Sequence, residues 1–558
     1  MTLSWSGTDS AVLRDIDLAF ARTLARLWPD AAAEALRVAA VASWAVQEGH
    51  GCLDLDVLRR DAGLRELLAG DSRIGAVAPD AWRVAIAAAP FAGDGAEAAP
   101  LVLERERIYL QRYFDYEREI ASLLRARAPL AESSSMDGNA QKLADGARAP
   151  ADRQALAIER ALASPLTVIC GGPGTGKTWA IARIVAQQAA LRPGVRIALA
   201  TPTGKAAARL TAALHDVLPG TPYEAVTIHR LLGIGRADRP PRHGPDRPLP
   251  FDAVIVDECS MVDLSLFAKL LRSLRPETAL VLVGDPRQLP AVEGGAVLGE
   301  LASLAAQGEA GLGACVVTLD HARRFEQSGG IATLTQAVSS GEPEATFAAL
   351  HGPGISWHEA ALGDDRGAFE LLVRRAYAPL AHAADAGAAL AALARFRVLG
   401  ALRAGPYGVA GLNATAAAAL GLSRGAAAYV GRPILVTEND AALGLANGDI
   451  GVVLPDADGR LVACVGDPRG APRRFALAQL PGHETAYAMT AHKAQGSEFD
   501  EVAIVLPPEP HPLVTREWLY TAVSRARSHV HVFATPAAIE AALARRVLVM
   551  SGLRERLE

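Results

Sequence analysis

The sequence is short of cysteine and has no long apolar run. Five cysteines occur among 558 residues, scattered singly and without a CxxC pair, so neither a zinc site nor a disulfide framework is expected. No stretch of about 18 uncharged apolar residues is present, so no membrane span is expected. Residues 1–10 lack the basic start and apolar core of a secretion signal. These absences favour a cytoplasmic, reduced protein.

Lysine is also scarce, with 5 lysines against 51 arginines. This scarcity excludes one kind of catalytic site. Many metal-dependent DNA nucleases use a D…[DE]-x-K cluster, which requires an acidic residue two positions before a lysine. The residues at those positions are Ala140, Thr175, Thr203, Phe267 and Ala491. None is acidic, so any DNA cutting must come from a partner.

The formal net charge is −5, which argues mildly against a passive nucleic-acid coat, since such proteins are basic. It leaves room for a motor with a narrow basic groove. The length predicts three or four domains. Residues 1–130 hold 19 acidic residues, 15 arginines and no lysine, and their apolar spacing predicts helices over 17–28, 31–48 and 110–127. This helical unit is either a small cap or a docking domain for a protein partner.

Residues 131–150 are polar and are predicted to form a linker. Short apolar strands then alternate with helices, which indicates parallel sheets with crossover helices. A first series of strands is predicted at 166–170, 196–201, 253–257, 280–284 and 315–319, and a second at 397–402, 433–437, 501–506 and 529–534. Within the second series, residues 448–480 contain short strands joined by Asp-Gly and Pro-Arg-Gly turns, which suggests a small all-β insertion of barrel type.

The strongest motif is GGPGTGKT, which follows the apolar strand LTVIC and precedes a helix-competent run. This is a complete P-loop in its strand–loop–helix context. Its backbone N–H groups and the following helix N-terminus are suited to phosphate oxygens. Lys177 is expected to contact the β- and γ-phosphates of ATP, and Thr178 to bind Mg²⁺. The expected nucleotide-binding residues are Gly171, Gly172, Pro173, Gly174, Thr175, Gly176, Lys177 and Thr178, with Gln154 upstream as a candidate contact to adenine.

Two further strands end in polar residues, where open α/β sheets bind their ligands. The first ends in Asp257 and Glu258; Asp257 is expected to hold Mg²⁺ through water, and Glu258 to polarise the attacking water. The second ends in GDPRQLP, where Gln288 is placed to sense the γ-phosphate.

Phosphoryl transfer also requires cations on the transition-state oxygens. Arg324 in LDHARRF and Arg525 in YTAVSRAR are the candidates, both in or beside the second strand series. If that series is a second domain, ATP lies in a cleft between two domains, and closure converts hydrolysis into motion.

Three motifs place hydroxyl, imidazole or ammonium groups at strand ends or helix starts, where they can bind DNA phosphates without reading bases. The motifs are TPTGKAAARL, TIHRLLG and TAHKAQGSEF, and the candidate DNA-binding residues are Thr201, Thr203, Lys205, His229, Thr490, His492 and Lys493.

The order of these motifs resembles superfamily 1 DNA helicases over residues 150–540. Within them, the motifs resemble the RecD family, the α subunits of exodeoxyribonuclease V (the RecBCD complex). The stretches HGCLDL and LERERIYLQRYFDYE, which lie outside the motor, are also similar to that family. Arg323 stands beside Arg324, so which of the two reaches ATP stays open.

The resemblance implies two RecA-like P-loop domains, at 151–318 and 319–558, with an SH3-like insertion at about 425–483 and an N-terminal helical domain at 1–130. It also implies ATP-dependent 5′→3′ translocation on single-stranded DNA from duplex ends, and assembly with RecB and RecC homologues in double-strand-break repair and recombination. A stand-alone superfamily 1 helicase, a non-motor ATP-binding scaffold and an RNA helicase are the alternatives. The intact motif residues speak against the scaffold.

Overall fold

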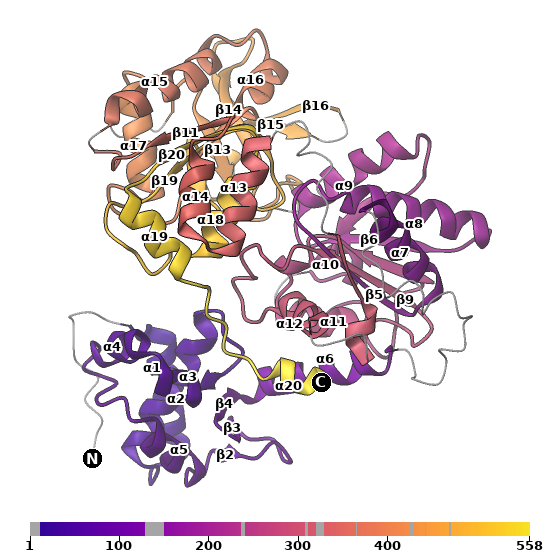
Figure 1. Ribbon diagram of the computed structural model, residues 1–558, viewed down its shortest axis with the longest axis vertical. Coiled ribbons are helices and arrows are strands. Elements are labelled where there is room, and N and C mark those ends of the chain that lie inside the picture. The colour runs from indigo at the N-terminus through magenta and orange to yellow at the C-terminus, as the bar shows by residue number, and fades with distance from the viewer. Residues whose placement is uncertain are drawn as a thin grey trace.

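The computed structural model describes residues 12–128, 150–235, 240–306, 311–319, 329–363, 365–422, 428–440, 442–467 and 470–558. Figure 1 shows an N-terminal domain and two motor domains, with the C-terminal segment running back from the second motor domain to the N-terminal domain. Among the described residues, no helix has the length and apolar character needed to cross a bilayer.

The N-terminal domain is mainly helical and adds a small sheet that the sequence did not predict. Its helices are α1 (Asp15–Leu27), α2 (Ala33–Gln47), α3 (Leu55–Arg60), α4 (Ala62–Ala69), α5 (Pro79–Ala87) and α6 (Gln111–Arg125). Four strands of two to four residues pair in the order β1-β4-β3-β2: β1 (Leu53–Asp54), β2 (Ala92–Gly93), β3 (Leu101–Glu104) and β4 (Arg107–Leu110). Strands this short show little periodicity, so the sequence indicates only the helices.

The first motor domain is a six-stranded parallel sheet in the order β10-β5-β9-β8-β6-β7. Its strands are β5 (Leu166–Gly171), β6 (Ile197–Thr201), β7 (Ala225–Thr227), β8 (Ala253–Val256), β9 (Ala279–Gly284) and β10 (Val316–Leu319). Its helices are α7 (Pro150–Ala163), α8 (Lys177–Leu191), α9 (Gly204–Val217), α10 (Ile228–Leu232), α11 (Leu264–Arg272) and α12 (Val297–Ala305). The central strands β5, β8 and β9 are buried almost throughout, as expected for a sheet covered on both faces.

The second motor domain has a five-stranded parallel sheet in the order β11-β20-β19-β12-β18. Its strands are β11 (Ile355–His358), β12 (Phe396–Gly400), β18 (Ala488–Thr490), β19 (Phe499–Val505) and β20 (Ala526–Phe533). Its helices are α13 (Gly329–Ser340), α14 (Pro343–Leu350), α15 (Arg366–Tyr377), α16 (Ala386–Leu393), α17 (Val409–Ala419), α18 (Arg516–Val523) and α19 (Pro536–Ala544), and the chain ends in α20 (Leu553–Leu557).

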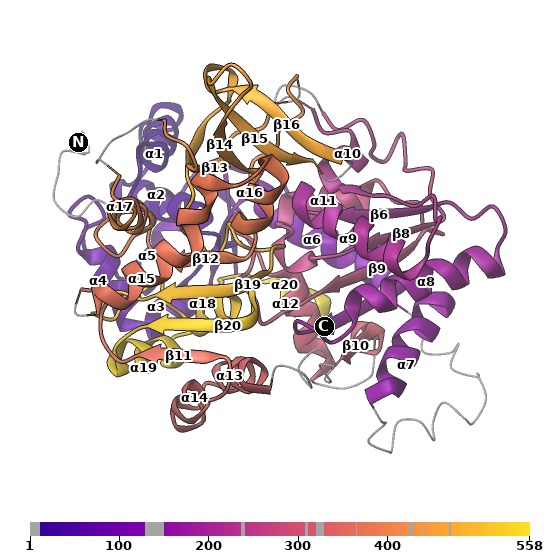
Figure 2. The same ribbon diagram turned by 90° about the horizontal axis from the view of Figure 1, so that it is seen from above.

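The insertion forms its own antiparallel sheet beside the second motor domain (Figure 2). Its order is β16-β15-β14-β13-β17, with β13 (Pro433–Val436), β14 (Ile450–Pro455), β15 (Leu461–Asp467), β16 (Gly470–Ala476) and β17 (His483–Thr485). The prediction that residues 433–437 belong to the parallel series is wrong, because β13 pairs antiparallel with β14 and β17. An apolar run of four residues does not reveal its pairing partner.

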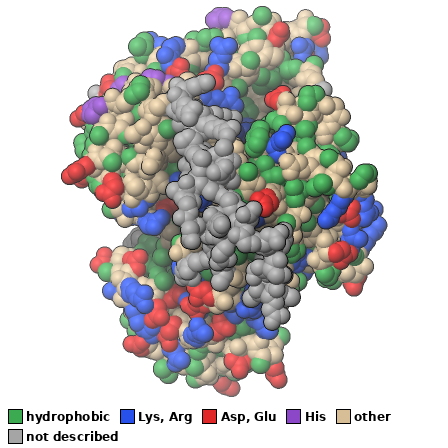
Figure 3. Space-filling view, turned by 45° about the vertical axis from the view of Figure 1, so that its right-hand side comes forward, with side chains coloured by type: hydrophobic (Ala, Val, Ile, Leu, Met, Phe, Trp, Pro, Cys, Tyr) green, Lys and Arg blue, Asp and Glu red, His purple; other side chains and the backbone are tan. Residues whose placement is uncertain are grey.

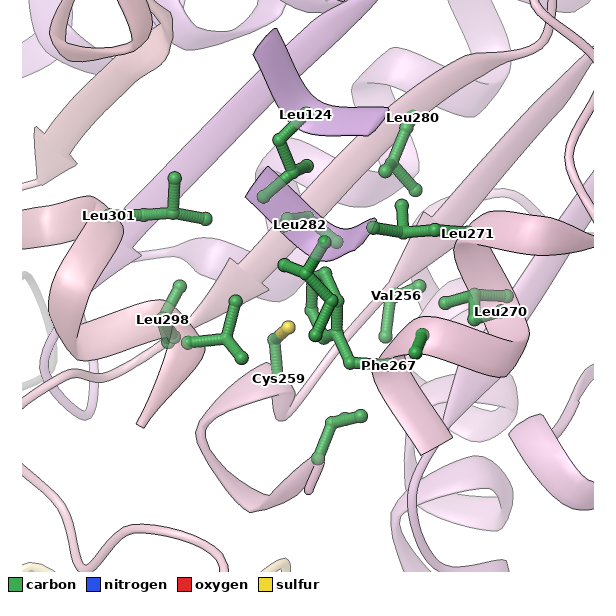
Figure 4. Packing of buried hydrophobic residues seen from close by; sticks show 14 of the residues in the cluster. Leu124, Val256, Cys259, Phe267, Leu270, Leu271, Leu280, Leu282, Leu298 and Leu301 are labelled. Carbon is green, nitrogen blue, oxygen red and sulfur yellow. The ribbon is translucent and has the colours of Figure 1, made fainter. Parts of the chain in front are cut away.

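Helix α6 belongs to the N-terminal domain by sequence position but packs into the core of the first motor domain. Its buried Ile120, Ala121 and Leu124 share one hydrophobic cluster with strands β5, β8 and β9. In Figure 4, Leu124 from α6 lies close to Leu282 of β9. The motor domain's core therefore includes residues that precede its P-loop by about 50 positions.

Candidate active site and nucleic-acid interface

The P-loop joins β5 to α8, and two of its glycines have backbone angles that suit only glycine. Gly174 and Gly176 have φ values of 75° and 88°. The loop is held from inside by Thr175, whose hydroxyl donates to the Gly172 carbonyl at 2.9 Å. Helix α8 begins at Lys177, so the N-terminus of a 15-residue helix points at the loop. This arrangement is suited to phosphate groups.

Lys177 and Gln154 both bond to the loop itself. Nζ of Lys177 donates to the carbonyls of Gly171 and Gly172 at 2.6 and 2.9 Å. The buried Gln154 donates from Nε2 to the Thr175 carbonyl at 2.8 Å. The side chain of Gln154 thus supports the P-loop, while its contact with adenine stays a prediction.

The acidic pair lies at the carboxyl end of β8, where the sequence predicts it. Burial, together with the neighbouring charge of Glu258, raises the pKa of Asp257 to about 6. Glu258 has a φ of 54°, in the left-handed region that non-glycine residues avoid. Its backbone N–H donates to Oδ1 of Asp257 at 2.8 Å, which holds the Asp257 carboxylate against the main chain of Glu258. Local strain of this kind is typical of functional sites.

Both motor domains line one cleft, with a volume of about 270 Å³. The first domain supplies the P-loop, Asp257, Glu258 and Gln288, and the second supplies Arg525. Gln288 lies buried, and among the described side chains its Oε1 is one of the few buried oxygens without a hydrogen-bond partner. An acceptor left in this way beside a P-loop fits a polar ligand such as a hydrated phosphate group.

Arg525 is buried and held by its own domain. Its Nε donates to the Thr521 carbonyl at 3.0 Å, Nη1 to the Ser497 carbonyl at 3.4 Å, and Nη2 to Oγ of Ser524 at 3.0 Å. Burial lowers its pKa, yet arginine stays charged in proteins. The second candidate, Arg324, and its neighbour Arg323 lie outside the described residues.

The two domains also meet at the loop that carries Gln288, through residues that the sequence analysis missed. Tyr520 donates from its hydroxyl to Oδ2 of the buried Asp285 at 2.7 Å. The Leu289 N–H donates to Oγ1 of Thr521 at 2.9 Å, and Gln495 donates to the Leu289 carbonyl at 2.9 Å. These residues lie inside the recognised motifs, so their position in the sequence could have marked them as site residues. Their pairing across the two domains could not be predicted from the sequence.

The candidate DNA residues of the first domain gather at the carboxyl ends of β6 and β7. Thr201 stands opposite Thr227 in the register of these strands, and the exposed His229 follows on α10. Thr203 caps α9 by accepting from the Ala206 N–H at 3.2 Å. Lys205 is not a freely exposed cation: it lies 5.8 Å from the ring centroid of Phe499, and burial lowers its pKa to about 7.

The candidates of the second domain follow β18, the edge strand of its sheet. Thr490 ends this strand and accepts from the Lys493 N–H at 3.3 Å. Lys493 pairs with Glu484 at 2.7 Å, and burial lowers the pKa of His492. A Cβ built on Gly496 would lie 3.6 Å from Oγ1 of Thr203, so this segment reaches the DNA motif of the first domain.

Two facing α/β domains with a P-loop on one side and an arginine on the other define an ATP-driven motor of the helicase class. Two family models match parts of these domains. Residues 154–294 match a family described as an AAA domain, and residues 485–533 match the UvrD-like helicase C-terminal domain. The chain is also 18% identical to a solved structure of Pif1 helicases on forked duplex DNA, covering 68% of this chain and 91% of that one with a TM-score of 0.40.

The family itself is shown by the N-terminal domain and by near-full-length relatives. Residues 9–109 match the N-terminal domain of RecBCD enzyme subunit RecD. The RecBCD enzyme subunit RecD of Mycolicibacterium smegmatis is 40% identical, covering 97% of each chain. The ATP-dependent RecD2 DNA helicase of Deinococcus radiodurans is 31% identical over 79% of this chain and 57% of its own length. The chain belongs to the RecD family of ATP-dependent DNA helicases.

Proposed function

We propose that this chain is the 5′→3′ translocase subunit of a RecBCD-type complex, which unwinds DNA from duplex ends together with RecB and RecC homologues. The observation that carries the proposal is the shared cleft: the P-loop of the first motor domain and Arg525 of the second line one cavity. Binding or hydrolysis of ATP in this cavity therefore moves the two motor domains relative to each other.

In this proposal each cleft residue has one role. Lys177 binds the β- and γ-phosphates, Thr178 and Asp257 hold Mg²⁺, and Glu258 orients the attacking water. Gln288 accepts a hydrogen bond from the water that hydrolysis consumes, and Arg525 stabilises charge on the transferred phosphoryl group. The bound Mg²⁺ neutralises charge on the phosphate oxygens.

DNA binding is assigned to the two strand-end clusters described above. From the first domain, Thr201, Thr203, Lys205 and His229 would contact the phosphates. From the second domain, Thr490, His492 and Lys493 would do so. Binding by such contacts weakens with added salt, because counterions are released when phosphates are bound.

Strand displacement tests the proposed direction. A duplex with a 5′ single-stranded overhang and one with a 3′ overhang are compared at equal length, with Lys177→Ala as the inactive control. Faster unwinding from the 5′ overhang is expected, and preference for the 3′ overhang would contradict the assignment. The same assay with RNA strands separates a DNA from an RNA helicase.

Partner docking is assigned to the N-terminal domain. Acidic and basic side chains lie interspersed over the face of this domain seen at the bottom of Figure 3, so this face offers DNA no continuous basic surface. Its exposed large apolar side chains are Ile16, Leu27, Leu67 and Val84. Apolar groups of this kind mark protein interfaces where they gather. Replacing all four by Asp is expected to abolish co-purification with RecB and RecC homologues while leaving DNA-stimulated ATPase unchanged.

A stand-alone helicase is the second candidate, because the matched RecD2 relative is named as an ATP-dependent DNA helicase and its name mentions no complex. The chain spans only 57% of that relative, whereas it spans 97% of the M. smegmatis subunit. Full unwinding activity of the isolated chain, unchanged by RecB and RecC homologues, would favour this second candidate.

A further inference from the structure

Helix α9 of the first motor domain touches the second domain along its first two turns. A Cβ built on Gly496 would lie 3.4 Å from Cβ of Ala206, so the Gly496 backbone runs close to the first turn. Two residues further on, Glu498 forms an ion pair with Arg209 in the second turn. Residues 496–498 of the second domain thus follow α9 of the first, and Figure 1 shows α9 on the side that faces the second domain.

The same short segment holds the catalytic arginine of the second domain. The Ser497 carbonyl accepts from Nη1 of Arg525 at 3.4 Å, and the Phe499 N–H donates to the Arg525 carbonyl at 2.9 Å. The side chain and the main chain of Arg525 are therefore both tied to residues 497–499. A displacement of Glu498 moves the groups that orient Arg525.

Glu498 needs a charged partner at this place. Its side chain is 9% exposed, and it lines the ATP cleft beside Arg209 and Arg525. Arg527, from its own domain, also pairs with it at 3.1 Å. A carboxylate this buried is stable only when paired, and Arg209 is the partner that belongs to the opposite domain.

We propose that Arg209 is a positioning residue through which DNA occupancy controls Arg525. Lys205 and Arg209 are four residues apart on one helix and therefore share a face. A shift of α9 caused by DNA at Thr203 and Lys205 passes to Glu498 through the ion pair, and from Ser497 to Arg525. The links from Arg209 to Arg525 are contacts between packed groups. The inference rests on the proposed function, since it requires that DNA binds near the start of α9.

The test compares ATP hydrolysis by the full chain with and without oligo-dT. In Arg209→Ala, DNA-stimulated kcat is expected to fall about tenfold, corresponding to the loss of about 1.4 kcal/mol of coupling. KM for ATP is expected to change less than about twofold, because the interaction acts on the transition state. Arg527→Ala is the matched control: it also removes a partner of Glu498, but not the link between domains, and DNA stimulation should persist.

A conservative change separates positioning from simple loss of structure. Arg209→Lys keeps a cation opposite Glu498 and is expected to retain most of the stimulation that Arg209→Ala removes. Arg209→Ala with wild-type stimulation, or Arg209→Lys with as little stimulation as Arg209→Ala, overturns the inference. If the wild-type chain itself shows no DNA stimulation, the proposed function fails, and this inference fails with it.

Discussion

Replacing Glu117 by Ala is expected to release the C-terminal segment from the N-terminal domain. Glu117 on α6 is fully buried, and its carboxylate accepts from the Ser551 hydroxyl at 2.7 Å and from the Gly552 N–H at 3.2 Å. Tyr109 also donates to it, at 3.2 Å. These donors lie up to 435 residues away in sequence, so one side chain joins the two ends of the chain.

The size of the effect follows from the donors that would lose their acceptor. Each buried donor left unsatisfied costs about 1–3 kcal/mol. Ser551 can turn its hydroxyl elsewhere, which leaves the Gly552 N–H and the Tyr109 hydroxyl. The free energy of local opening should therefore fall by about 3 kcal/mol, or about 100-fold in an equilibrium constant.

Glu117→Gln serves as the matched variant. Burial raises the pKa of Glu117, so ionisation of this carboxyl is less favourable in the folded chain than in the unfolded one. Since the folded pKa lies above the unfolded one, the contribution of Glu117 to stability falls as pH rises through the interval between them. Glutamine keeps an acceptor and carries no charge, so its variant should hold the segment at pH 7 and lose this pH dependence.

Hydrogen–deuterium exchange of residues 550–557 measures the opening directly. The Ala variant should lose protection there by about two orders of magnitude, and the Gln variant should stay close to wild type. Wild-type protection in the Ala variant would refute the argument that these hydrogen bonds hold the segment. Equal loss in both variants would show that the negative charge is required.

Three further predictions concern the motor. Lys177→Ala should abolish ATP hydrolysis without changing the melting temperature, and Glu258→Gln should still bind ATP with kcat reduced by a factor of about 10² or more. ATPase and nucleotide-binding assays check both variants. Wild-type rates of hydrolysis would exclude these roles for Lys177 and Glu258. Because burial lowers the pKa of Lys205 to about 7, its positive charge is lost as pH rises through that value, and DNA affinity should weaken from pH 6 to 8. Lys205→Arg should remove this part of the pH dependence. Identical pH profiles of DNA binding in the wild-type chain and the variant would contradict the prediction. Leu124→Ala should destabilise the first motor domain by about 2–5 kcal/mol, since Leu124 is fully buried in its core, and an unchanged thermal transition of that domain would argue against the shared core.

The sequence predicted eight of the eleven parallel strands in the described motor sheets, each to within three residues, because each is an apolar run that ends in polar or glycine-rich residues. The short strands β7, β11 and β18 were not predicted. The strand before Asp257 and Glu258 is an example: it was predicted at 253–257 and is observed as β8 (Ala253–Val256). The P-loop could be identified from the sequence equally well, because few other sites have this spacing of glycine, lysine and threonine. The roles of the individual site residues stay predictions.

Contacts between distant segments could not be predicted from local patterns. Glu117 lies in a run of charged residues and has the appearance of a surface carboxylate; its burial depends on donors near residue 551. Likewise, Lys205 was expected to face DNA phosphates, and its burial depends on Phe499, which belongs to the other motor domain. Periodicity reports which face of an element is apolar, and not which element covers it.

These long-range contacts change what the N-terminal domain can be. Helix α6 completes the core of the first motor domain, and Met550, which follows the second motor domain, is buried in the core of the N-terminal domain. The N-terminal domain thus packs against the first motor domain, and residues 545–549 connect it to the second. Opening and closing of the cleft must be absorbed between Ala544, where α19 ends, and Met550. A partner docked on the N-terminal domain would therefore keep its position relative to the first motor domain while the second motor domain moves. A translocating subunit needs this arrangement if its complex is to stay assembled during each step.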